Sequence, residues 1–318
     1  MSPSSEDHKT TGPSEPIKRL EQAIGDIEAT YQEWENQVKE ASAKIDERAG
    51  RPLWQAILVG LALGGVFLAS LLFTKLLFFV FIATLVSLAV IELVTALQEK
   101  GSRLPRVWMV LVSIAVLASG YLFGADGMLL GLFIAIVAVF VGRLVDSALN
   151  ASARPTFLRD IQGGIFVVVY VPFLASFAIV TQSASSGQWW VLASVVIVVA
   201  VDTAAYATGL AIGRHKLAPQ ISPAKTWEGL GGATVAALIA GAAFGQFLLG
   251  IGWLQGMVFA LLLVGSATMG DLVESLIKRD LGIKDMSSLL PGHGGFMDRL
   301  DSLLPSMAVV YIAYQLFA

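Results

Sequence analysis

The chain has 318 residues, of which 56% are hydrophobic and only 14% are charged, and its mean hydropathy is +0.73. This composition places it among membrane proteins. The chain contains no cysteine, which excludes disulfides, thiolate metal sites and cysteine nucleophiles. The net charge of −3 is small, so the positions of the charges carry more information than their sum.

The N-terminal region differs from the rest of the chain. Residues 1–14 are rich in Ser, Pro, Gly and Thr, and we expect them to be disordered. Within residues 15–50, apolar residues recur at alternating steps of three and four, at Ile17, Leu20, Ile24, Ile27, Tyr31, Trp34, Val38, Ala41 and Ile45. This heptad pattern predicts a cytoplasmic helix. The helix either pairs as a coiled coil to give a homodimer or lies as an amphipathic helix on the membrane or on the protein's own loops.

Nine apolar runs are long enough to cross a bilayer, which takes roughly 17–25 residues of helix. They lie near 53–73, 76–97, 107–123, 127–143, 161–180, 188–212, 230–249, 253–277 and 303–317. The sequence therefore predicts an all-α polytopic membrane protein. We expect an N-terminal transmembrane bundle over 51–200 and a catalytic transmembrane region with cytoplasmic loops over 201–318.

Lys and Arg are distributed unequally between the loops of this topology. If the N-terminus is cytoplasmic, the cytoplasmic loops carry thirteen of them: Lys100, Arg103, Arg106, Arg143, Arg154, Arg159, Arg214, Lys216, Lys225, Lys278, Arg279, Lys284 and Arg299. The opposite loops carry only Lys75. By the positive-inside rule, this asymmetry predicts a cytoplasmic N-terminus. We expect a multi-pass protein of the plasma or inner membrane, with its site on the cytoplasmic side.

Asp202 interrupts an apolar span, about 21 Å along a helix that begins at Gln188. A charge at this depth costs several kcal/mol unless it is paired, solvated or bound to a cation, so Asp202 is a functional candidate. Tyr206 and Gly209 follow on the same helix face. For Gly209 and Gly213 close helix packing is an equally good explanation.

The loop ISPAKTWEG follows this span and contains Ser222 and Lys225. A helix that starts at Thr226 would present its N-terminus beside these groups, which makes a phosphate site. Read alone, the lysine is also explained by the positive-inside bias.

The stretch GDLVESLIKRDLGIKDMSSLLPGHGGFMDRLDS, residues 270–302, carries ten charged side chains. Its first part places four polar side chains on one face of a helix: Asp271, Glu274, Ser275 and Lys278. If this helix begins near Trp253, Asp271 lies about 27 Å along it, at the depth expected for Asp202. The two carboxylates therefore predict a shared polar chamber.

The second part of the stretch combines basic groups, a glycine-rich loop and two further carboxylates. The glycines allow backbone N–H groups to approach an anion closely. Carboxylates without cysteine, and with His293 as the one histidine nearby, favour Mg²⁺ over zinc. We expect His293 to be a loop hydrogen-bond donor or a phosphate contact. Mg²⁺ with phosphates at a helix end is typical of phosphoryl or nucleotidyl transfer.

Residues 275–301, SLIKRDLGIKDMSSLLPGHGGFMDRLD, resemble the signature of the phosphatidate cytidylyltransferase (CDP-diacylglycerol synthase) family. That signature has Ser-x-x-Lys-Arg, then Lys-Asp, then Pro-x-His-Gly-Gly-x-x-Asp-Arg-x-Asp. The SPAKTWEG loop and the Asp202 helix are also similar to the family. The resemblance is specific over roughly 202–302, and the heptad segment lies outside it.

The resemblance implies that CTP and phosphatidate react to give CDP-diacylglycerol and pyrophosphate, and that no nucleic acid is bound. It implies that Asp271 and Asp298 hold Mg²⁺ or another divalent cation, with Asp202 and Asp301 as further metal candidates. It assigns catalytic roles to Lys278 and Arg279 as well. The implied substrate contacts are Ser222, Lys225, Ser275, Lys284, His293, Gly294, Gly295 and Arg299.

An ion-coupled transporter is the alternative from another class, because intramembrane carboxylates also mark ion pathways. A transporter site is expected near the bilayer midplane between repeated halves. The charges here lie towards one face and we find no internal repeat, so the sequence favours the enzyme.

Overall fold

The structure is a computed structural model that describes residues 53–283, 286–287 and 295–318. The chain divides into two units, residues 1–58 and residues 59–318, and the second contains every helix from α3 onwards. The predicted tail and heptad helix lie outside the described residues, as do Lys284, His293 and Gly294.

Helices make up most of the described chain. In order they are α2 (Leu53–Phe73), α3 (Lys75–Glu99), α4 (Arg106–Leu149), the short 3₁₀ helix η1 (Ala151–Thr156), α5 (Phe157–Val168), the π turn η2 (Val169–Phe173), α6 (Leu174–Ser183), α7 (Gly187–Ile212), α8 (Trp227–Phe247), α9 (Trp253–Asp280), α10 (Met297–Leu300) and α11 (Leu303–Phe317). Among the described residues, seven helical segments are long and apolar enough to cross a membrane. The protein is therefore a multi-pass membrane protein.

One element departs from the all-α expectation. Between α7 and α8 the chain forms an antiparallel hairpin of β1 (Lys216–Ala218) and β2 (Ser222–Thr226). Pro219 follows β1 directly, where its fixed φ suits a tight turn. Helix α8 then begins where the sequence predicts, because the Thr226 hydroxyl accepts a hydrogen bond of 3.1 Å from the Gly229 N–H and caps the helix.

Helix α4 reverses its direction at Gly124, whose φ of 66° and ψ of −143° are not helical. Beyond the reversal, the Gly127 carbonyl accepts a hydrogen bond of 2.6 Å from the Ser119 hydroxyl. A Cβ on Gly131 would lie 2.9 Å from the Cβ of Ser119, whereas twelve residues of straight helix span about 18 Å. The two arms of α4 therefore correspond to the separate spans predicted at 107–123 and 127–143.

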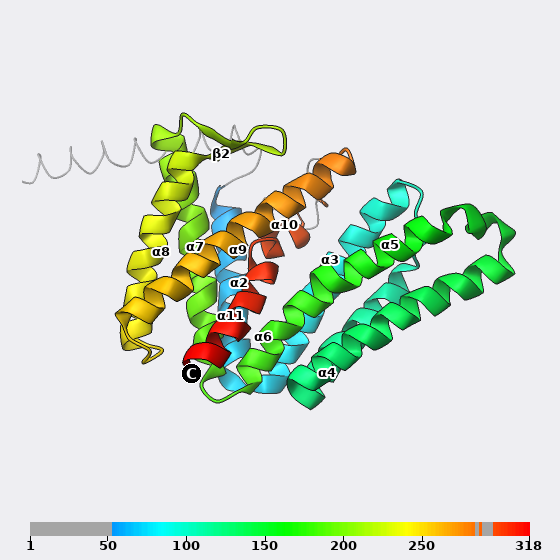
Figure 1. The fold of residues 1–318 in the computed structure, drawn as a ribbon, viewed down its shortest axis with the longest axis horizontal. Coiled ribbons are helices and arrows are strands. Elements are labelled where there is room, and N and C mark those ends of the chain that lie inside the picture. Colours follow the sequence, from blue (N-terminus) through cyan, green and yellow to red (C-terminus); the bar gives the residue numbers. More distant parts are fainter. Residues whose placement is uncertain (1–52, 284–285, 288–294) are drawn as a thin grey trace, which may run out of the picture. The chain divides into compact units, whose positions relative to one another are not determined.

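Helices α7, α8 and α9 pack against one another in chain order, as Figure 1 shows. Glycines allow the close approach: a Cβ on Gly229 of α8 would lie 2.8 Å from the Ala205 carbonyl of α7, and one on Gly256 of α9 would lie 2.8 Å from the Cα of Gly245. Such small-residue contacts are the usual packing device of membrane helices. Gly209 of α7 also faces α8, as its packing interpretation predicts, and it lines the polar cavity described below as well.

The connections between the helices gather at two ends. At one end, the Lys75 ammonium donates to the Ser183 carbonyl, and the Tyr314 hydroxyl donates to the Ser185 carbonyl over 3.1 Å. These contacts join the start of α3, the end of α6 and the C-terminal part of α11. The loop after α3 lies at the other end, where the Lys100 carbonyl accepts from the Arg159 guanidinium.

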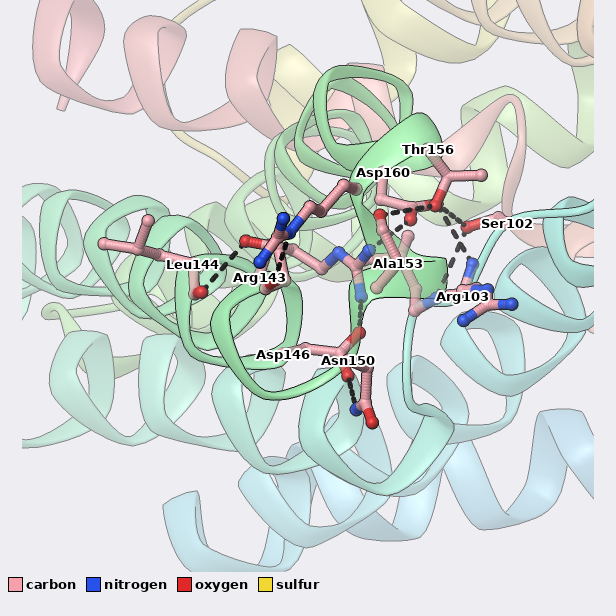
Figure 2. Close-up of polar contacts among 12 residues, drawn as sticks. Ser102, Arg103, Arg143, Leu144, Asp146, Asn150, Ala153, Thr156 and Asp160 are labelled. Carbon is pink, nitrogen blue, oxygen red and sulfur yellow. Dashed lines mark hydrogen bonds and ion pairs between the residues drawn. The ribbon is translucent and has the colours of Figure 1, made fainter.

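A buried ion pair between Arg143 and Asp160 stabilises the end at which the loop after α3 lies, as Figure 2 shows. Arg143 and Asp160 are 2% and 0% exposed, and their side chains meet at 2.6 Å, with Asp146 as a second partner of Arg143. The other Asp160 oxygen accepts from the Ser102 hydroxyl at 2.7 Å and the Arg103 N–H at 3.0 Å. Breaking a buried pair typically costs about 3–5 kcal/mol, so this cluster locks α4, α5 and the loop after α3 together.

Candidate active site

A polar cavity of about 640 Å³ lies between α7, α8, α9, the hairpin and the segment around α10. Its charged and hydroxyl lining residues include Asp202, Tyr206, Lys216, Ser222, Lys225, Asp271, Glu274, Lys278, Asp298, Arg299 and Asp301. The structure thus brings together two regions of the chain that the sequence analysis identified separately. Asp202 and Asp271, from different helices, line the same chamber, which confirms the sharing predicted from their depths.

Three carboxylates form the centre of this cavity. Asp271, Glu274 and Asp301 each offer an oxygen, and the three oxygens lie within 4.8 Å of one another. Glu274 is 1% exposed, and its Oε1 is buried without a hydrogen-bond partner. A buried carboxylate oxygen without a partner is costly, and a divalent cation with hard oxygen ligands would satisfy it. The donor set fits Mg²⁺.

Glu274 was not among the predicted site residues, although the sequence placed it on the polar face of its helix. Asp202 and Asp298 line the cavity, but neither belongs to the three-carboxylate group. The packing of α9 against the segment around α10 decides which carboxylates come close enough to share a cation. The spacing of the acids along the chain does not reveal that packing.

Lysines connect the carboxylates. Lys278 bridges Glu274 at 2.5 Å and Asp298 at 3.1 Å, while Lys225 of the hairpin forms an ion pair with Asp271 of α9. Each of these lysines is mostly covered, with side chains 18% and 23% exposed, so the pairs are little screened by solvent. The cavity therefore holds both the anions that a metal needs and the cations that phosphates need.

Asp298 organises the loop that precedes it. Its Oδ2 accepts hydrogen bonds from the Gly295 N–H at 2.8 Å and the Met286 N–H at 3.3 Å, and its Oδ1 faces Lys278. Through Lys278, the Asp298 carboxylate therefore connects Met286 and Gly295 to α9.

Glu92 of α3 is a site-building residue that the sequence analysis did not identify. It is 3% exposed and accepts hydrogen bonds from the N–H groups of Phe296 at 3.0 Å and Met297 at 2.9 Å, and from the Ser287 hydroxyl. A Cβ on Gly295 would lie 2.7 Å from its Oε2. The glycine that was expected to approach a substrate anion thus approaches a carboxylate of the protein itself. The rule that singled out Asp202, a lone charge in an apolar span, applies equally to Glu92.

Other predicted site residues lie at the margin. The Arg279 Nε donates to the Ile221 carbonyl over 3.3 Å, which ties the end of α9 to the hairpin turn. The Ser275 hydroxyl lies 3.5 Å from the Asp271 Oδ1. Among the described residues, neither Arg279 nor Ser275 lines the polar cavity.

Sequence comparison identifies the family to which this site belongs. A model of the Cytidylyltransferase family matches residues 54–317, which contain every helix and strand described above except the first residue of α2. The chain belongs to the cytidylyltransferase family. This cytidylyltransferase is 38% identical over 291 residues to the phosphatidate cytidylyltransferase of Mycobacterium bovis, an alignment that covers 87% of this chain and 93% of the relative.

Two further relatives carry the same name. The phosphatidate cytidylyltransferase of Mycobacterium leprae is 38% identical over 280 residues, which cover 85% of this chain and 90% of the relative. The phosphatidate cytidylyltransferase of Bacillus subtilis is 33% identical over 269 residues, which cover 83% and 98% respectively. The comparisons confirm the resemblance found in the sequence and give the transporter alternative no support.

Proposed function

We propose that this cytidylyltransferase transfers the cytidylyl group of CTP to phosphatidate, forming CDP-diacylglycerol and pyrophosphate for phospholipid synthesis. The observation that carries the proposal is the polar cavity. It combines a tight group of carboxylates with lysines and an arginine at one end of membrane-spanning helices, in a chain related to phosphatidate cytidylyltransferases. A soluble nucleotide and a lipid headgroup can both reach such a place.

Mg²⁺ or another divalent cation is the proposed cofactor. Asp271, Glu274 and Asp301 would hold it, with Asp298 and Asp202 as further ligands within the same cavity. When bound, the ion would neutralise phosphate charge and increase the electrophilicity of the α-phosphorus.

The proposed reaction needs no nucleophile from the protein. A phosphate oxygen of phosphatidate attacks the α-phosphorus of CTP, and the bond from that phosphorus to the bridging oxygen of the β-phosphate breaks, releasing pyrophosphate. Lys225, Lys278 and Arg299 hold the phosphates in line and offset their charge, and Ser222 donates a hydrogen bond to them. Catalysis then consists of positioning and electrostatic stabilisation.

The proposed topology has nine spans, with a cytoplasmic N-terminus in the plasma or inner membrane. The reversal within α4, the two groups of loop contacts and the distribution of Lys and Arg support it. In that orientation the polar cavity opens on the cytoplasmic side, where CTP is available.

The heptad pattern supports a homodimer. Deleting residues 1–48 is expected to halve the mass of the protein–detergent particle after subtraction of detergent, while turnover per chain persists, because the family resemblance does not extend to the heptad segment. Light scattering of the detergent-solubilised protein measures the mass. An unchanged mass would argue against coiled-coil pairing and for an amphipathic helix at the membrane surface.

The activity is tested with the purified protein in mixed micelles. With CTP, phosphatidate and Mg²⁺ present, we expect pyrophosphate release and CDP-diacylglycerol in equal amounts, and neither product when one substrate is omitted or EDTA is added. Folded protein that releases no pyrophosphate under these conditions would refute the proposed function.

A further inference from the structure

A second, apolar cavity of about 230 Å³ lies between α2, α3, α6, α7, α10 and α11. Gly64 and Phe67 of α2, Phe78 and Val86 of α3, and Met307 of α11 are among the residues that line it. Within the described part of the chain, Arg299 is its single charged lining residue. A cavity of this kind accommodates hydrocarbon and excludes polar ligands.

Arg299 also lines the polar cavity, so one side chain borders both spaces. Arg299 therefore lies at the position where one lipid molecule could place its phosphate in the polar cavity and a hydrocarbon chain in the apolar cavity. Arginine suits this position, because its guanidinium binds phosphate in a bidentate manner.

The apolar cavity extends away from the polar one along α3. Its α3 lining runs from Phe78 to Val86, about 12 Å of helix at 1.5 Å per residue. Glu92, which contacts the loop before α10, lies about 9 Å beyond Val86 on the side of the polar cavity. The cavity therefore runs from Arg299 and Leu300, beside the polar cavity, to Phe78, which lies one turn from the start of α3 at the opposite end of the helices.

We propose that this apolar cavity holds one acyl chain of the lipid substrate, with Arg299 placed between that chain and the phosphate that reacts. The proposal rests on the proposed function, because it assigns a chain-binding part to the same lipid site. An acyl chain that moves from the bilayer into the protein gains little hydrophobic free energy, since both surroundings are apolar. The cavity therefore selects a chain by its length and shape. A filled cavity adds little affinity by itself, but a blocked cavity leaves no room for the chain beside the phosphate at Arg299 and so weakens binding.

Gly64→Leu tests the assignment. A Cβ on Gly64 meets no atom within 4 Å, so the larger side chain occupies the cavity without displacing the backbone. We expect kcat/KM for dioleoyl phosphatidate to fall about tenfold or more, whereas kcat/KM for dioctanoyl phosphatidate stays within twofold of the unmodified protein. Retained activity with the short lipid also shows that the variant is folded.

Gly65→Leu is the matched control. The adjacent glycine also has open space around its Cβ position, but it does not line the apolar cavity, so both lipids should be used as by the unmodified protein. An equal loss with both lipids in Gly64→Leu, or no loss with either, would overturn the assignment.

Binding of dioleoyl phosphatidate in the absence of CTP gives a readout that does not depend on turnover. We expect the dissociation constant to rise in Gly64→Leu and to stay constant in Gly65→Leu. If the three proteins differed in binding as expected but the unmodified protein gave no turnover, the proposed function would fail and the assignment of the chain-binding cavity would stand. Equal binding by all three proteins would contradict the cavity assignment.

Discussion

Asp271→Asn is expected to lower cytidylyl transfer at least 100-fold while the protein stays folded. Asparagine keeps the size of the side chain but removes one of the three clustered carboxylates and the anionic partner of Lys225. A bound cation that loses a ligand stabilises the charge on the reacting phosphates less well, and loss of one preorganised electrostatic contact typically costs about 100- to 1,000-fold. Turnover in mixed micelles, measured at a series of Mg²⁺ concentrations, checks the result.

A second readout separates metal binding from chemistry. In the unmodified protein, Mg²⁺ is expected to raise the midpoint of thermal unfolding, because a ligand that binds only the folded state stabilises it. Asp271→Asn should show a much smaller rise. Asp126→Asn, an exposed carboxylate beside the reversal of α4, is the matched control and should behave like the unmodified protein in both measurements. Near-normal turnover of Asp271→Asn would exclude its role as a metal ligand.

Glu92→Gln is expected to lower kcat/KM about 10- to 100-fold, although the side chain does not line the polar cavity. Its carboxylate accepts hydrogen bonds from the Phe296 and Met297 N–H groups. Glutamine replaces one acceptor oxygen by an NH₂ donor that faces these donors, so the start of α10, which carries Asp298 and Arg299, shifts. Glu92 is thus a positioning residue.

The dependence on Mg²⁺ distinguishes positioning from a general loss of folded protein. Displacement of Asp298 should raise the Mg²⁺ concentration needed for half-maximal rate, whereas a smaller folded fraction lowers the rate at every concentration alike. Glu92→Asp, which keeps two acceptor oxygens, should recover part of the rate. Glu99→Gln, an exposed change seven residues later on the same helix, is the control. A lower rate with unchanged Mg²⁺ dependence in Glu92→Gln would show that its role is structural only.

Much of the fold followed from local patterns. Hydropathy predicted the apolar helices, including two separate ones where the chain reverses at Gly124, because a long run of apolar residues favours helix within a bilayer. The rise per residue predicted that Asp202 and Asp271 lie at one depth, and both line the polar cavity. The sequence also predicted a helix start at Thr226, and α8 begins there with Thr226 as its N-cap.

The sequence analysis did not predict the hairpin, because local patterns do not reveal it. Its strands have three and five residues, too few for a pattern of alternation, and Pro223 within β2 has no N–H to donate. Besides the pairing of its own strands, two contacts from α9 support the hairpin: the Lys225–Asp271 ion pair and the hydrogen bond from Arg279 to the Ile221 carbonyl.

The amino-acid sequence by itself determined the groups available to this protein: membrane helices, carboxylates that can bind a hard cation, basic groups that can bind phosphate, and the glycine-rich loop between them. These depend on residue types and on spacings within single helices. Tertiary structure alone decided that Glu274 joins Asp271 and Asp301, that Glu92 holds a loop more than two hundred residues away, and that Arg299 borders an apolar cavity. Each of these contacts joins segments that are separated in the sequence. Such contacts depend on how the helices pack against one another and not on any local periodicity.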